Sequence, residues 1–105
     1  MEKQMKVVVK DPGKKPEVKE ISDDIFEIQE TVGGFFEIVR PFEDMHMLLV
    51  CNGEGVYRDG RPNTLIGGQA IFGPLFICGE EPGEDGYEFA GLTEEQAKHF
   101  MELLG

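Results

Sequence analysis

The sequence predicts an α+β fold: an antiparallel sheet of four to five strands with two helices, both in a single layer on one face. Three observations support this prediction. Apolar residues at helical spacing end at Gly33-Gly34, where a strand-like run begins at once. Short β-prone runs separated by turn residues fill most of the rest, and a second amphipathic segment closes the chain. With 105 residues and no repeat or linker, residues 1–105 are expected to form one domain.

The N-terminal residues predict a hairpin. Residues 5–10 contain three consecutive valines and favour a first strand. Residues 11–16 combine Pro and Gly and are typical of a turn. Residues 17–21 alternate charged and aliphatic side chains, a pattern that suits an edge strand pairing with the first.

A helix is expected next. Ser22 is the predicted N-cap, because a hydroxyl can accept from the free amides of the first turn. Gly33 is expected to end the helix in the left-handed conformation that glycine adopts without a Cβ clash. Helical spacing places three aliphatic residues on one buried face, namely Ile25, Ile28 and Val32.

The centre of the chain predicts further strands. Residues 35–40 and 45–51 favour two strands, followed by a tight turn at Asn52-Gly53. Residues 54–63 are interpreted as a long loop with a short strand at 55–57. Residues 70–78 favour a central strand, although Gly73-Pro74 requires a bulge or an edge there.

The C-terminal residues predict a loop, a short strand and a helix. Residues 80–86 are interpreted as an acidic loop, and residues 87–89 as a short strand. Residues 93–96 match a capping box, because a Thr is followed three positions later by a Gln. The apolar face of the last helix should consist of Ala97, Phe100, Met101 and Leu104.

Charge and composition narrow the classes of function. The chain has 21 Asp and Glu against 10 Lys and Arg, a net charge of −11, and the basic residues concentrate near the N-terminus. Such a field opposes direct binding to nucleic acid or an anionic membrane, and favours a basic protein surface. Neither a membrane-spanning run nor a secretion signal is expected, so the predicted location is cytoplasmic. Exposed strand edges also make a homodimer a hypothesis.

Motifs for chemistry are few. Cys51 and Cys78 lie in β-like runs and are interpreted as buried, reduced thiols. His46 and Cys51 differ by an odd number, so a regular strand would direct them to opposite faces. No phosphate-binding loop or metal-ligand spacing is found, and no cofactor or catalytic residue is predicted. We therefore expect a protein that is not an enzyme.

Four sequence elements follow one another along the chain: Gln-x-x-Val-Gly-Gly-aromatic-aromatic-Glu-x-Val at 29–39, Asn52 with Glu54-Gly55, Pro62-Asn63, and Leu-Thr-Glu-Glu-Gln at 92–96. Together they resemble the domain of unknown function 3846 family of short bacterial and phage proteins. The resemblance covers nearly the whole chain, implies a setting in phages or mobile elements and assigns no catalytic residues. A basic residue is common after the family's Pro-x-Asn element, and Thr64 departs from that pattern here.

Two hypotheses of function follow. The first is an acidic interaction protein that binds a basic partner, for example as an inhibitor of a host nucleic-acid-binding defence enzyme. Its candidate interaction residues are Glu80, Glu81, Glu84, Asp85 and Glu88. The alternative is a binding module for a small anion or nucleotide, in which a loop of local positive charge holds the ligand. The candidate ligand residues are Asn52, Arg58, Arg61 and Asn63.

Overall fold

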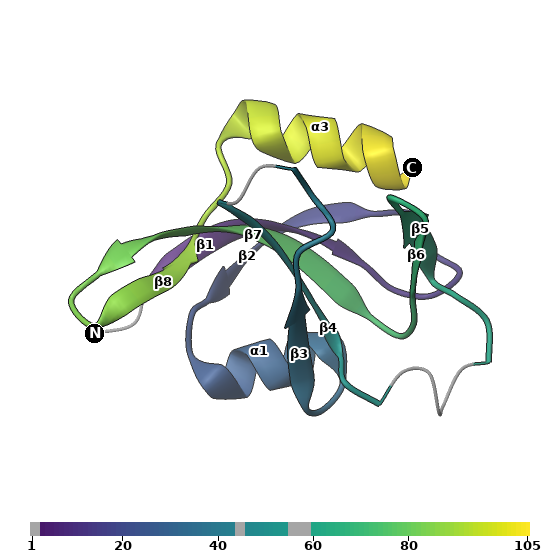
Figure 1. Cartoon of the computed structure of the whole chain (residues 1–105), viewed down its shortest axis with the longest axis horizontal. Helices are drawn as coiled ribbons and strands as arrows, with labels where there is room; N and C mark the ends of the chain where they lie inside the picture. The colour runs from purple at the N-terminus through teal and green to yellow at the C-terminus, as the bar shows by residue number, and fades with distance from the viewer. Residues whose placement is uncertain (1–2, 44–45, 55–59) are drawn as a thin grey trace.

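The computed structural model describes residues 3–43, 46–54 and 60–105. Two helices and eight strands lie in these residues (Figure 1). The helices are α1 (Ile25–Val32) and α3 (Glu94–Leu104). The strands are β1 (Gln4–Lys10), β2 (Glu17–Ser22), β3 (Phe36–Val39), β4 (Met47–Asn52), β5 (Thr64–Ile66), β6 (Gln69–Ile71), β7 (Leu75–Gly83) and β8 (Gly86–Ala90).

The strands form one large sheet and one small hairpin. The large sheet has the order β2-β1-β7-β4-β3, and β8 pairs with β7. Within the described parts of the chain, strands β5 and β6 pair only with each other. All pairs are antiparallel, which confirms the predicted α+β class. The large sheet has six strands, more than the four to five predicted.

The two helices cover opposite faces of the sheet, so the prediction of one helical face is wrong (Figure 1). Strand β4 is buried along its whole length, and its successive side chains point to alternate faces. Leu48 and Val50 pack in the cluster that contains Ile28 of α1. Leu49 packs in the other cluster, with Phe100 of α3. A strand that is apolar on both faces needs a cover on each side, and each helix provides one.

The predicted strand at 70–78 is two strands. Gly73 has a φ of 77°, in the left-handed region, and together with Pro74 it separates β6 from β7. Strand β6 then pairs with β5 in the separate two-stranded sheet, while β7 becomes the central strand of the large one. The sequence correctly indicated an interruption at Gly73-Pro74, but the chain there changes from one sheet to another instead of forming a bulge or an edge within one strand.

The acidic loop predicted at 80–86 is mostly strand. Strand β7 continues to Gly83 and β8 begins at Gly86, which leaves only residues 84–85 as the turn. Glu80 N donates to His46 O, so the nitrogen two positions later, in Pro82, points to the same edge. That edge has no partner strand there among the described residues, and a proline fits because no N–H is needed. The short strand predicted at 87–89 is confirmed within β8.

Helix α1 begins later than predicted. Ser22 still belongs to β2, where it pairs with Gln4, and Asp24 is the N-cap. The Ser22 hydroxyl accepts a 3.1 Å hydrogen bond from Asp24 N, so it supports the turn before the helix. Ile25 is 52% exposed rather than part of the core, whereas Ile28 and Val32 are buried as predicted.

The two helix-end predictions are confirmed. Gly33 has a φ of 81°, and Gly34 N donates to Gln29 O at 2.8 Å. At α3, Thr93 and Gln96 form both hydrogen bonds of the capping box. Ala97, Phe100 and Leu104 are buried as predicted, and Met101 is half-buried. The short strand predicted at 55–57 lies outside the described residues.

Candidate functional site

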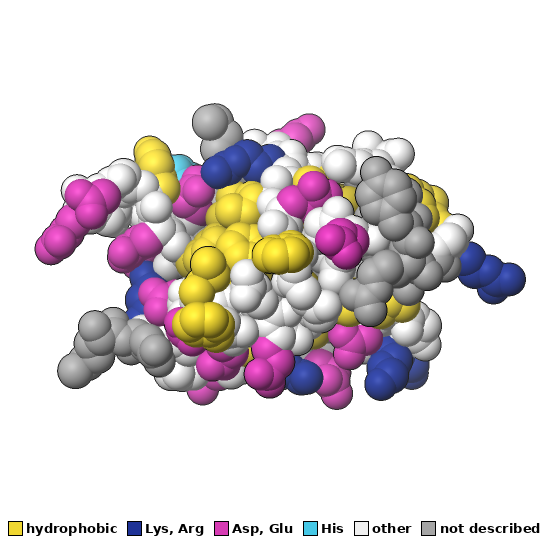
Figure 2. All heavy atoms as spheres, turned by 90° about the horizontal axis from the view of Figure 1, so that it is seen from below, with side chains coloured by type: hydrophobic (Ala, Val, Ile, Leu, Met, Phe, Trp, Pro, Cys, Tyr) yellow, Lys and Arg dark blue, Asp and Glu magenta, His cyan; other side chains and the backbone are white. Residues whose placement is uncertain are grey.

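Large hydrophobic side chains are exposed on the face of the molecule that carries α1. Phe26 in α1 is 74% exposed, and Phe35, which follows α1, is 73% exposed. Helix α1 packs against β3, whose Ile38 is also exposed. Figure 2 shows hydrophobic side chains gathered on this face, with carboxylates around them. We call Ile25, Phe26, Phe35 and Ile38 the α1 patch.

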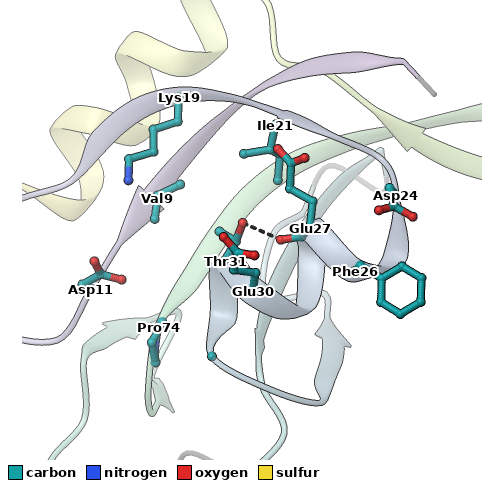
Figure 3. A pocket seen from close by; sticks show the side chains of 11 residues that line it. Val9, Asp11, Lys19, Ile21, Asp24, Phe26, Glu27, Glu30, Thr31 and Pro74 are labelled. Atoms are coloured by element: carbon teal, nitrogen blue, oxygen red, sulfur yellow. Dashed lines mark hydrogen bonds between the residues drawn. The ribbon is translucent and has the colours of Figure 1, made fainter.

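An acidic groove of about 640 Å³ lies between α1 and the β1–β2 hairpin (Figure 3). Its apolar lining includes Val9, Ile21 and Pro74, and Phe26 stands at its rim, so the groove adjoins the α1 patch. Four carboxylates line it, on Asp11, Asp24, Glu27 and Glu30.

One hydrogen bond holds the carboxylate of Glu27 in place. Glu27 Oε1 accepts from Ser22 N at 2.9 Å, while Thr31 Oγ1 donates to the backbone carbonyl oxygen of Glu27 at 2.8 Å. Lys19 lines the groove as well, but its amine lies 3.6 Å from Glu17 and is partly neutralised by it. The groove therefore has a surplus of negative charge and is suited to a Lys or Arg side chain.

The predicted acidic cluster lies on the β7–β8 hairpin, where local cations neutralise part of it. Arg40 binds both carboxylate oxygens of Glu80, at 3.0 and 2.9 Å, which lowers the pKa of Glu80. Lys3 Nζ lies 2.7 Å from Glu81 and 3.3 Å from Glu88, and their carboxylates raise the pKa of Lys3. Of the five residues in the predicted cluster, the exposed turn residues Glu84 and Asp85 are the two without an ion pair to another described residue.

The predicted ligand loop is partly structural. Asn52 is 5% exposed; its Nδ2 donates to Val32 O at 2.9 Å, and its Oδ1 accepts from Glu54 N at 2.7 Å. Asn52 therefore ties the end of α1 to the sheet, a role that sequence reasoning missed. The tight turn predicted at Asn52-Gly53 gave the only signal, because Asn often bonds the backbone two residues on.

Asn63 has a similar role. Its Nδ2 donates to Lys10 O at 2.9 Å and to Gly73 O at 2.8 Å, while its Oδ1 accepts from Lys10 Nζ at 2.7 Å. Arg61 is exposed, and Arg58 lies outside the described residues. The amides of Asn52 and Asn63 are thus occupied by internal hydrogen bonds, and the described part of the loop brings only Arg61 to the surface as a cation.

The cysteines are buried free thiols, as predicted. Burial, with a smaller contribution from Glu37, raises the pKa of Cys51 to about 11. Burial likewise raises the pKa of Cys78 to about 12. Both remain protonated near neutral pH and are weak nucleophiles. Among residues 3–43, 46–54 and 60–105, no group of three or more His, Cys, Asp and Glu side chains is arranged to hold a metal ion.

An apolar groove of about 560 Å³ lies on the opposite face, between residues 41–43 and α3. The rings of Phe42 and Phe100 lie 5.1 Å apart in its wall, and His99 stands beside Phe100. Two carboxylates, Glu43 and Glu95, line this groove, against four in the acidic groove beside α1.

Comparison with known proteins gives one match. No curated protein and no solved structure matches this chain. No helix in the described parts of the chain is both long and apolar enough to cross a membrane. The model of the family described as Domain of unknown function (DUF3846) matches residues 5–105. Because that match covers nearly the whole chain, the protein belongs to the DUF3846 family.

Proposed function

We propose that this protein is a non-enzymatic interaction protein that binds a basic partner protein through its α1 face. That face consists of the α1 patch and the adjoining acidic groove. The main support for this proposal is the exposure of two phenylalanines, Phe26 and Phe35, each of which is about three-quarters exposed. Apolar patches rimmed by polar residues are typical of protein–protein contacts, and aromatic side chains supply much of the binding energy there.

Charge supports the choice of partner. The groove beside the patch has four carboxylates, and the whole chain has a net charge of −11. A complementary surface therefore has apolar residues at its centre and Lys or Arg at its rim. Nucleic-acid-binding enzymes carry basic surfaces of this kind. We propose a host defence enzyme of that class as the partner, with inhibition as the consequence of binding.

The α1 face supports this proposal better than the β7–β8 hairpin does. The hairpin's Glu80, Glu81 and Glu88 already have cationic neighbours, and its exposed aromatic residue is Tyr87 alone among the described hairpin residues. The α1 face also differs from a mimic of duplex DNA, which needs a regular row of charges, because its centre is hydrophobic (Figure 2).

Matched variants test the proposal. The tagged wild-type protein would capture partners from host extract, and each partner would then be purified and its affinity measured. Replacing both Phe26 and Phe35 with Ser should weaken binding by about thirtyfold or more, because each removes a large aromatic contact. Leu65→Ser is the control, since Leu65 in β5 is 68% exposed but lies away from α1.

A second arm separates the two acidic surfaces. Replacing Glu84 and Asp85 with Lys reverses the charge at the hairpin turn and leaves the α1 face intact. We expect the affinity for the partner to change by less than about threefold, because charges outside the centre of an interface contribute little to binding. A partner that tolerates the Phe26→Ser, Phe35→Ser double variant but is lost with the hairpin variant would contradict the assignment to the α1 face.

A further inference from the structure

Strand β3 is the last strand of the large sheet, and its outer edge is unpaired among the described residues. Gly53 N donates to Phe35 O at 2.8 Å, which identifies that pair as hydrogen-bonded. In an antiparallel ladder such pairs alternate with pairs whose N–H and C=O point outward. Because Phe36 pairs with Asn52 and Ile38 with Val50, the peptide groups of Phe36 and Ile38 face away from β4.

The two end strands of the order β2-β1-β7-β4-β3 differ in their protection. The opposite edge, β2, has the exposed charged residues Glu17, Lys19 and Glu20, which discourage pairing with another chain. Strand β3 has one charged residue, Glu37, and its Ile38 belongs to the α1 patch. An unprotected edge beside an exposed apolar patch is the arrangement to which extended peptides add as strands.

We infer that β3 accepts an extended segment of the basic partner as an added antiparallel strand. This inference rests on the proposed function and names how the partner binds. The peptide groups of Phe36 and Ile38 supply the hydrogen bonds. The side chains of the added strand alternate between the two faces of the sheet, as do those of β3.

The chemistry of β3 specifies the segment. Phe36 packs against the buried cluster that contains Ile28 of α1. Ile38 lies on the same face, because it pairs with Val50 of that cluster, so the residues opposite Phe36 and Ile38 should be apolar. Glu37 is exposed on the other face, so the residue opposite it should be Lys or Arg. The segment is therefore an alternation of apolar and basic residues. A second copy of this chain fits less well, because pairing through β3 would bring together two Glu37 side chains and two chains of charge −11.

Synthetic peptides test the mode of binding. The probe is acetyl-Lys-Val-Lys-Val-Lys-Val-Lys-amide, titrated into the wild-type protein to about millimolar concentration, which detects weak strand addition. Binding should slow hydrogen exchange of the Phe36 and Ile38 amides and leave the outer edge of β2 unchanged. N-methylation of the valines, whose amides would face β3, should weaken binding about tenfold or more. N-methylation of the lysines, whose amides would face outward, should have a much smaller effect.

A variant of the edge gives an independent test. Ile38→Pro removes the outward N–H and leaves the hydrogen bonds to β4, so the protein should fold and lose the peptide. Ile38→Ala removes most of the side chain but keeps the N–H, and it should bind more tightly than Ile38→Pro. The amide-exchange result on the wild type stands even if the proline variant is unstable.

Three outcomes overturn the inference: no protection of Phe36 and Ile38, equal binding of both methylated peptides, or protection that rises with protein concentration alone. The last would mean that a second copy occupies β3. If the captured partner no longer binds the Phe26→Ser, Phe35→Ser double variant but binds the Ile38→Pro variant normally, the inference of strand addition is refuted and the proposed function stands. If the partner binds that double variant normally, the proposed function fails first.

Discussion

Replacing Asn52 with Ala would remove the amide that ties the end of α1 to the sheet. In the structure that side chain donates to Val32 O and accepts from Glu54 N, at 2.9 and 2.7 Å, and it is 5% exposed. Each hydrogen bond contributes roughly 1 kcal/mol net, and a buried carbonyl left without a partner costs about 1–3 kcal/mol. We expect the free energy of unfolding to fall by about 2–3 kcal/mol, out of the roughly 5–15 kcal/mol of a typical domain.

Urea unfolding followed by circular dichroism would measure this change. With a slope of roughly 1–3 kcal/mol per M for a small domain, the midpoint should fall by about 0.7–3 M. Gln69→Ala is the control, because that amide is exposed on β6 and its loss should cost less than about 0.5 kcal/mol. Asn52→Asp keeps the acceptor for Glu54 N but loses the donor to Val32 O, so it should also be destabilised. A loss below about 0.5 kcal/mol for Asn52→Ala would refute the reasoning.

Three further outcomes can be measured by the same unfolding assay. Gly33→Val should lower the free energy of unfolding by at least about 1–2 kcal/mol, because the φ of Gly33 is 81°, in the left-handed region. Gly53→Ala should cost less, because a Cβ at that position would lie 3.5 Å from Phe35 O, an ordinary contact distance. Equal costs would contradict the assignment of Gly33. Thr93→Ala should cost about 1 kcal/mol through loss of the capping box, and full stability would refute that role. Since the pKa values of Cys51 and Cys78 are raised to about 11 and about 12, their stabilising effect should be complete below about pH 8.5, the unfolded value, and decline as pH rises towards 11. Replacing both cysteines with Ala should reduce that decline, and an unchanged decline would contradict it.

Features encoded by neighbouring residues could be predicted from the sequence. The left-handed Gly33 and the Thr93–Gln96 capping box depend on residues within one or two helical turns. The antiparallel sheet followed from short β-prone runs joined by turn residues. Buried thiols followed in the same way, since both cysteines lie in apolar strands.

Features that depend on distant residues could not be predicted. The role of Asn63 requires Lys10 and Gly73, which meet it only in the folded chain. The placement of α1 and α3 on opposite faces depends on β4 being central, whereas alternation alone does not order the strands. The candidate site was missed for a related reason. Helical spacing from Ile28 and Val32 already directs Phe26 away from the buried face, but only the folded chain puts Phe35 and Ile38 on the same face of the molecule.

A photo-crosslinking measurement tests the central claim, that the α1 face binds a basic partner, most directly. The photoreactive amino acid p-benzoylphenylalanine would replace Phe26 or Phe35 in one set of proteins, and Leu65 or Tyr87 in the control set. All four side chains are more than 60% exposed, so accessibility is matched. Irradiation in host cells should give a crosslink from positions 26 and 35 to one protein rich in Lys and Arg, and no such crosslink from positions 65 and 87. Crosslinks to that protein from the control positions alone, or none from 26 and 35, would contradict the account.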